Sequence, residues 1–227
     1  MGHRGAAGLE KENTFASMQA GIDDGADMIE FDVRLTADNI PVVIHDGDLR
    51  RTHDNDHVIR SHTLAELEAL ELEPRVPTLD ELMEHFFGKT LLNIEVKSRA
   101  TAGPVLGVIR KYCGNSKDKW DSIIVSSYLA KELVRFRKLS DKVNLALLHH
   151  NNPFLYIAYQ RRVDFTAVGF HRLHLNKLAT EIAKKANIFT YAYTADRPKS
   201  ARLLEEHGMD GIVTNYPSKI ANALDKD

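Results

Sequence analysis

Short apolar segments of strand character alternate with helical segments along almost the whole chain, and this alternation most constrains the fold. The predicted strands are 1–4, 27–33, 40–45, 91–96, 122–126, 143–148, 165–169, 188–193 and 211–214. The predicted helices are 13–24, 63–70, 78–87, 102–112, 129–138, 152–160, 175–186 and 198–207. Short apolar strands are typical of a parallel sheet covered by helices. Eight βα-like units in 227 residues therefore predict an α/β fold, a compact (β/α)₈ TIM barrel, with an open doubly wound sheet as the alternative.

The length and composition indicate one soluble domain. No linker or low-complexity segment interrupts the chain, so we expect residues 1–227 to form a single barrel domain. A net charge of −2 gives no general attraction to nucleic acid or to a membrane surface. The chain has no apolar run of membrane-spanning length and no leader of basic then apolar residues, and its one cysteine excludes an internal disulfide. We therefore expect a cytoplasmic protein without stable membrane insertion, and its oligomeric state stays open.

Two acidic residues interrupt the apolar strand predicted at 27–33. Side chains alternate between the two faces of a strand, so Glu30 and Asp32 share one face. The strand at 91–96 repeats the pattern with Glu95. Carboxylates on the inner face of packed strands are costly unless a cation meets them. The three acids therefore predict an oxygen-lined site for a hard divalent ion, Mg²⁺ or Ca²⁺.

The barrel hypothesis gives the polar residues at strand ends a common location. Active sites of TIM barrels lie at the carboxyl ends of their strands. Polar side chains fall at these ends in the predicted pattern: His3, Arg4, Glu30, Asp32, His45, Asp46, Glu95, Lys97, Ser126, Ser127, Tyr193 and Thr194. The two serines lack a convincing histidine and acid partner, which disfavours a serine nucleophile. Residues 149–150, 171 and 174 are further histidines, which we interpret as surface or capping residues.

An ordered set of motifs runs through the chain. They are Gly2-His3-Arg4-Gly5, Glu12-Asn13-Thr14, Ile29-Glu30-Phe31-Asp32-Val33, His45-Asp46, Leu49-Arg50-Arg51-Thr52, Pro77-Thr78-Leu79-Asp80-Glu81, Asn93-Ile94-Glu95-Val96-Lys97 and Gly208-Met209-Asp210-Gly211. In this order the chain closely resembles the glycerophosphodiester phosphodiesterase family. The resemblance implies a TIM barrel that hydrolyses glycerophosphodiesters to glycerol 3-phosphate and an alcohol, in phospholipid or glycerol metabolism.

The resemblance also implies roles for particular residues. One divalent ion, Mg²⁺ or Ca²⁺, would bind at Glu30, Asp32 and Glu95, and His3 and His45 would form a general acid/base pair. Two histidines on opposite sides of a phosphorus can share these proton transfers near neutral pH.

Other polar residues are expected to bind substrate or to support the site. A guanidinium fork suits a phosphate oxygen, so Arg4 is a candidate phosphate ligand. Lys97 can neutralise either the phosphate or the carboxylates, and Tyr193 is either pocket wall or core. The supporting residues we expect are Glu12, Asn13 as a helix N-cap, and Asp46, which can orient His45, hold a loop or touch metal.

Three features depart from the family pattern. Asp196 replaces a common asparagine, and we expect it not to touch the chemistry. Tyr128 stands where phenylalanine is frequent, so its hydroxyl is expected to alter the pocket for the alcohol. Only Met1 and Gly2 precede the His-Arg-Gly motif. Either the true start lies upstream of Met1, or the barrel closes with a very short first strand.

Two other functions remain open at this point. A related barrel phospholipase D-type enzyme, acting on lysophospholipids or sphingomyelin, would share the histidines and the acids but would need an apolar acyl groove. A catalytically silent phosphoester-binding barrel would be expected to lack a histidine or an acid, and none is missing here. Fold alone decides neither case.

Overall fold

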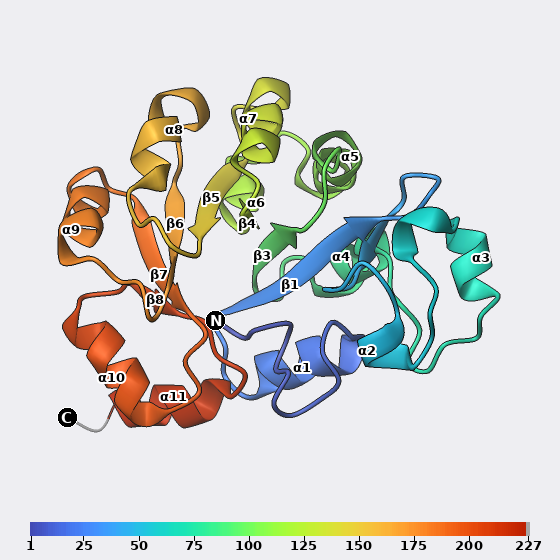
Figure 1. Cartoon of the computed structure of the whole chain (residues 1–227), viewed down its shortest axis with the longest axis horizontal. Helices are drawn as coiled ribbons and strands as arrows, with labels where there is room; N and C mark the ends of the chain where they lie inside the picture. Colours follow the sequence, from blue (N-terminus) through green and yellow to red (C-terminus); the bar gives the residue numbers. More distant parts are fainter. Residues whose placement is uncertain (226–227) are drawn as a thin grey trace.

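The computed structural model describes residues 1–225 and shows a parallel sheet curved into a barrel (Figure 1). Its strands lie side by side in chain order: β1 (Met28–Leu35), β3 (Leu91–Val96), β4 (Ile123–Ser127), β5 (Asn144–His149), β6 (Ala167–His171), β7 (Phe189–Tyr193) and β8 (Gly211–Ile212). Gly2 bridges in parallel to Ile29 on one side and to Thr214 on the other, so it closes the barrel between β1 and β8. The TIM barrel prediction is confirmed, and the open doubly wound sheet is wrong.

The first strand, predicted at 1–4, is reduced to the bridges of Gly2. Its N–H donates to the Met28 carbonyl at 2.8 Å, and its carbonyl accepts from the Glu30 N–H at 2.8 Å. A Cβ atom on Gly2 would lie 2.1 Å from the carbonyl oxygen of Gly5, because the chain turns back immediately after the bridge. This turn takes His3 and Arg4 out of the strand and into the mouth of the barrel.

The extended piece predicted at 40–45 is not a barrel strand. It forms β2 (Pro41–Val43), which pairs antiparallel with the end of β1 through Val33 opposite Val43. A parallel partner would need a crossover of a dozen residues or more. Only five residues separate Leu35 from Pro41, so the chain can return only as a hairpin.

Helices surround the outside of the barrel (Figure 1). They are α1 (Phe15–Asp23), α4 (Leu79–Phe86), α5 (Ala102–Cys113), α6 (Lys117–Asp121), α7 (Ala130–Leu139), α8 (Leu155–Val163), α9 (Lys177–Lys185), α10 (Pro198–Glu206) and α11 (Pro217–Leu224). α4 begins at a capping box of Thr78 and Glu81, with both reciprocal hydrogen bonds formed. Two of these helices, α6 and α11, were not predicted from the sequence, and both are short.

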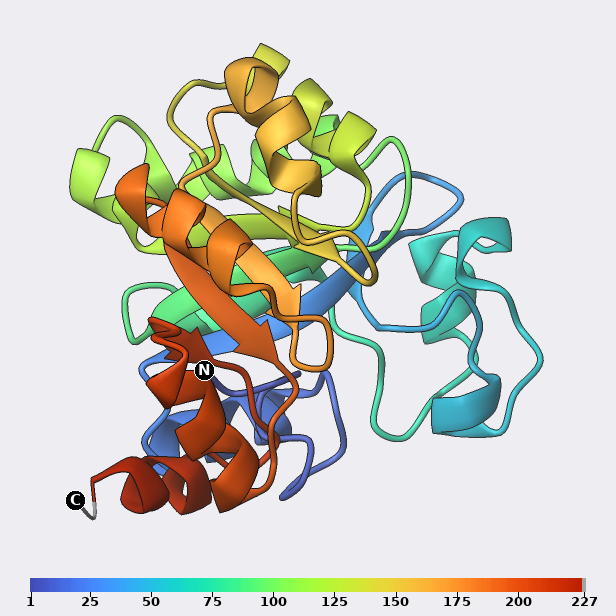
Figure 2. The ribbon, with the colours of Figure 1, turned by 60° about the vertical axis from the view of Figure 1, so that its left-hand side comes forward.

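An excursion between β2 and α4 projects beyond the barrel (Figure 2). It contains α2 (Arg50–His53), the 3₁₀ turn η1 (Ile59–Ser61) and α3 (Leu64–Glu68). A separate small core stabilises it, made of Val42, Ile44, Leu49, Ile59 and Leu67. The excursion starts directly after His45 and Asp46, so its packing positions these two residues at the barrel mouth.

On β1 and β3, apolar and acidic side chains point to opposite faces of the sheet, as the alternating sequence pattern predicted. Ile29, Phe31 and Val33 pack in the large core between the sheet and the helices, as do Leu92 and Ile94. The intervening acids on both strands therefore face the barrel interior, at the end of the barrel where the strands finish.

Candidate active site

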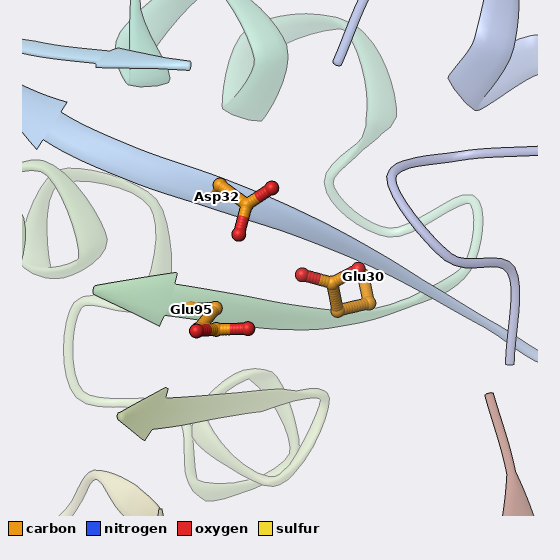
Figure 3. A group of neighbouring side chains, drawn as sticks. All are labelled: Glu30, Asp32 and Glu95. Carbon is orange, nitrogen blue, oxygen red and sulfur yellow. The ribbon is translucent and has the colours of Figure 1, made fainter. Parts of the chain in front are cut away.

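Three carboxylates from two neighbouring strands meet inside the barrel. Glu30 and Asp32 belong to β1 and Glu95 to β3 (Figure 3). Asp32 lies directly opposite Glu95 in the parallel register, and one oxygen of each acid lies within 4.8 Å of the others. All three are at least nine-tenths buried. Among the described residues, Oε1 of Glu30 has no hydrogen-bond partner. Buried carboxylate oxygens with an unfilled acceptor are the donor set of a hard divalent cation.

Two cationic side chains partly neutralise the three carboxylates. Lys97 Nζ lies 2.6 Å from Glu95 Oε1 and 3.4 Å from Asp32 Oδ1, and Arg4 Nε lies 3.3 Å from Asp32 Oδ2. Burial, reinforced by the charge of Asp32, still raises the pKa of Glu95 to about 7. Burial and the neighbouring carboxylates raise the pKa of Glu30 well above its usual range. Burial also tends to raise the pKa of Asp32, but the positive charges of Lys97 and Arg4 outweigh this effect, so the pKa of Asp32 is lowered. The cluster therefore retains a need for positive charge.

A chain of hydrogen bonds holds His3. Its Nδ1 lies 2.8 Å from Asn215 Oδ1, and the Asn215 amide donates to Asp196 Oδ2 at 2.7 Å. Asp196 also accepts from the Asn215 N–H at 2.8 Å and from the Thr214 hydroxyl at 3.0 Å. Burial, reinforced by the charge of Arg4, lowers the pKa of His3. Asp196 makes no hydrogen bond to His3 itself, but it holds Asn215, the partner of His3, so it supports the histidine through that residue.

An ion-pair chain connects His45 with the opposite loop. His45 Nδ1 lies 2.7 Å from Asp46 Oδ1, and Arg51 Nε donates to the other Asp46 oxygen at 2.6 Å. Arg51 also holds Glu12 at 2.5 Å, and Glu12 accepts from Arg4 at 2.8 Å. Of the roles left open for Asp46, the structure shows a contact with His45 and a second one with Arg51 of the excursion. Arg51 was not among the predicted site residues, although it belongs to the motif Leu49-Arg50-Arg51-Thr52.

Asn13 is not the helix N-cap that the sequence predicted. Thr14 caps α1 in a capping box with Ser17. The Asn13 amide instead donates to Asp32 Oδ2 at 3.0 Å, and its Oδ1 accepts from the Asp32 N–H at 3.1 Å. Asn13 reaches this position because it has a φ of 59°, a left-handed conformation that asparagine tolerates better than most residues. It therefore fixes the Asp32 carboxylate.

Glu30, Glu95 and both histidines line one cavity of about 200 Å³. Arg4, Lys97 and Tyr193 also line it, so the structure brings the predicted substrate-binding residues together. The Tyr193 hydroxyl donates to the His149 carbonyl at 2.8 Å, which fixes the ring as a wall of the cavity. Buried polar side chains also line it, Asn93 of β3, Ser126 of β4 and Tyr191 of β7.

The interpretation of the remaining histidines as surface or capping residues is partly wrong. His150 and His174 are exposed, but His171 lines the cavity. His149 is 3% exposed and packs edge-on against Phe170, with ring centroids 4.9 Å apart. Burial lowers the pKa of His149 to about 4, so its ring is neutral. A strand of six residues that ends in histidine does not reveal from its sequence which face the last side chain takes.

None of the helices in residues 1–225 has the length and apolar character needed to cross a bilayer.

A closed βα barrel with clustered acids and two anchored histidines at the carboxyl ends of its strands has the architecture of a barrel enzyme. The chain belongs to the glycerophosphoryl diester phosphodiesterase family, whose model matches residues 3–219.

Individual relatives agree with this assignment. YhdW of Bacillus subtilis is 31% identical over 96% of this chain and 94% of the relative. A glycerophosphodiester phosphodiesterase of Caldanaerobacter subterraneus is 29% identical over 99% of this chain and 96% of the relative. A phosphodiesterase of Oleispira antarctica, solved with the product sn-glycerol-3-phosphate, superimposes with a TM-score of 0.85 at 26% identity, covering 99% and 96% of the two chains. The enzyme class predicted from the motifs is confirmed.

Proposed function

We propose that this phosphodiesterase hydrolyses glycerophosphodiesters to glycerol 3-phosphate and an alcohol, in glycerol or phospholipid metabolism, with one divalent ion, Mg²⁺ or Ca²⁺, at Glu30, Asp32 and Glu95. The observation that carries the proposal is the convergence of three buried carboxylates, two of which line one cavity together with two anchored histidines. The sn-glycerol-3-phosphate held by the Oleispira antarctica relative supports the choice of product.

The three acids fit such an ion because they offer only oxygen donors and one of these lacks a partner. When bound, the ion would neutralise the charge of the phosphodiester and the negative charge that develops in the transition state. Lys97 stabilises the same carboxylates from the side, since its ammonium already lies against Glu95 and Asp32. Arg4 borders the cavity and can donate to a phosphate oxygen, and Tyr193 bounds the space for the substrate.

His3 and His45 are proposed as the acid/base pair. The Nδ1 atom of each ring is held by a neighbour, Asn215 for His3 and Asp46 for His45. Nε2 is therefore the ring nitrogen of each residue left for the substrate. One imidazole would take a proton from the nucleophile, and the other would give a proton to the departing alcohol oxygen as the phosphorus–oxygen bond breaks.

The experiment that tests this function is incubation of the enzyme with glycerophosphocholine and Mg²⁺, with products identified by phosphorus NMR. Glycerol 3-phosphate with free choline is the expected result. Phosphocholine with free glycerol would show that the opposite bond is cleaved and would overturn the proposal. A transient cyclic phosphate signal would show that a glycerol hydroxyl attacks before water does.

The affinity for the metal is expected to fall in acid. A metal ligand must lose its proton, and without metal the pKa of Glu95 is about 7. Below this pH protons compete with the ion, so the apparent Kd for Mg²⁺ should rise about tenfold per pH unit for each proton displaced. Titration calorimetry at several pH values, in buffers of different ionisation enthalpy, measures both the Kd and the protons released. A Kd that stays constant across about pH 5.5 to 8 would contradict the assignment of Glu95.

Removing Asp196 is expected to loosen the positioning of the His3 ring and to change its pKa. Hydrogen bonds to a charged group contribute ~1.5–3 kcal/mol, so Asp196→Ala should lower kcat/KM by about 10- to 100-fold. The charge of Asp196 raises the pKa of His3, so the limb of the pH–rate profile governed by His3 should also move to lower pH. Asp196→Asn keeps an acceptor for Asn215 and is expected to recover part of the rate. An unchanged pH profile in a folded Asp196→Ala variant would rule out this positioning role.

A further inference from the structure

A second cavity of about 530 Å³ adjoins the active-site cavity. Tyr128, at the end of β4, lines both cavities. Its ring stacks on His150, with centroids 4.2 Å apart and planes 9° apart, and Lys97 Nζ lies 5.5 Å from the ring centroid on the catalytic side. Tyr128 is therefore the shared wall between the place where the phosphodiester is cleaved and the second cavity.

Cationic side chains surround the second cavity. Arg99 follows the end of β3, and Lys131 and Arg135 lie on α7. Within residues 1–225, Arg99 and Lys131 are exposed and have no carboxylate within ion-pair distance, whereas Arg135 pairs with Glu132 at 2.9 Å. Two cations are thus left without a protein partner beside the active site.

The acidic residue of this cavity does not balance these cations. Glu132 is 1% exposed, and its carboxylate accepts from the backbone N–H groups of Ala100 and Ala102, from the Thr101 hydroxyl and from Arg135. Its negative charge is used to hold the start of α5. The accessible face of the second cavity therefore has a net positive charge and, in Leu129 and Tyr159, some apolar wall.

We propose that the second cavity is the subsite for the departing alcohol, and that it favours an alcohol that carries its own phosphate group. This inference rests on the proposed function. The catalytic cavity of about 200 Å³ accommodates the glycerol phosphate end, and the alcohol then extends past Tyr128. A negative charge on that alcohol meets Arg99 and Lys131, which raises affinity and the rate of encounter.

The test uses two substrates that differ by one glycerol phosphate unit on the departing alcohol, and therefore by one negative charge. In glycerophosphoglycerol the departing alcohol is glycerol, and in bis(glycerophospho)glycerol it is glycerophosphoglycerol, which carries a second phosphodiester. The wild-type enzyme should have the higher kcat/KM for the larger substrate. The double variant Arg99→Gln/Lys131→Gln should lose about fivefold to tenfold of kcat/KM for bis(glycerophospho)glycerol, mainly through KM, and keep its value for glycerophosphoglycerol. Lys138→Gln, an exposed change at the far end of α7, is the matched control.

Two outcomes would overturn the subsite. One is a loss of kcat/KM by the same factor on both substrates in the double variant, and the other is no loss on either. If the wild type cleaves neither substrate, the proposed function fails. In that case the subsite is tested by binding alone. The affinity for bis(glycerophospho)glycerol is measured by titration calorimetry in a His45→Ala protein, with and without the double change. Binding that does not depend on Arg99 and Lys131 overturns the inference there too.

Discussion

Replacing Glu95 by glutamine should abolish most of the activity while the barrel remains folded. Glutamine preserves the shape of the side chain but removes the charge that meets the ion and Lys97. Removing a residue that only supports a metal ligand already lowers metal affinity or activity by about 10- to 100-fold. Replacing the ligand itself should therefore lower kcat/KM for a glycerophosphodiester by at least about 10²-fold. The affinity for Mg²⁺, measured by titration calorimetry, should fall in parallel.

Removal of the ion should give the same result by another route. Enzyme treated with EDTA should lose activity and regain it on addition of Mg²⁺ or Ca²⁺. Glu181→Gln, on the exposed side of α9, removes one charge without touching the site and should leave both activity and metal affinity unchanged. Full activity in folded Glu95→Gln enzyme, or in metal-free enzyme, would disprove the proposed metal centre.

Alanine at His3 or at His45 is expected to reduce kcat by about 10²- to 10⁴-fold, the contribution usual for a general acid or base. Each change removes a ring whose Nδ1 is anchored and whose Nε2 is proposed to serve the substrate. The structural effect should be small, because both rings lie at the cavity and not in the apolar core.

The pH–rate profile provides the second measurement on this pair. Burial is the largest influence on both rings, and it lowers the pKa of His3 and of His45. The base must be neutral, so the rate falls when acid protonates it. The acid must be protonated, so the rate also falls as pH rises through its pKa. A bell-shaped profile is expected, and each alanine change should remove one limb. A flat profile from about pH 5 to 9, with chemistry rate-limiting, would exclude the pair.

The supporting network could not be predicted from sequence because its members are distant along the chain. His3 near the N-terminus depends on Asn215 and Asp196, which lie in the loops after β8 and β7, about 200 residues later in the chain. Arg51 lies in the excursion and joins Asp46 to Glu12. Motif positions indicate that such residues matter, but which carboxylate an arginine meets is decided by loop packing.

The sequence by itself determined the barrel, the inward acids and the two histidines proposed as the acid/base pair. These follow from local periodicity, since a strand with period two must place Glu30 and Asp32 on one face, and from motif order. The tertiary structure alone decided that β2 pairs as a hairpin, that Gly2 closes the barrel, that Asn13 holds Asp32, and that His149 is buried. Each of these depends on a partner far along the chain or on a turn of the backbone, and neither leaves a periodic trace in the residues themselves.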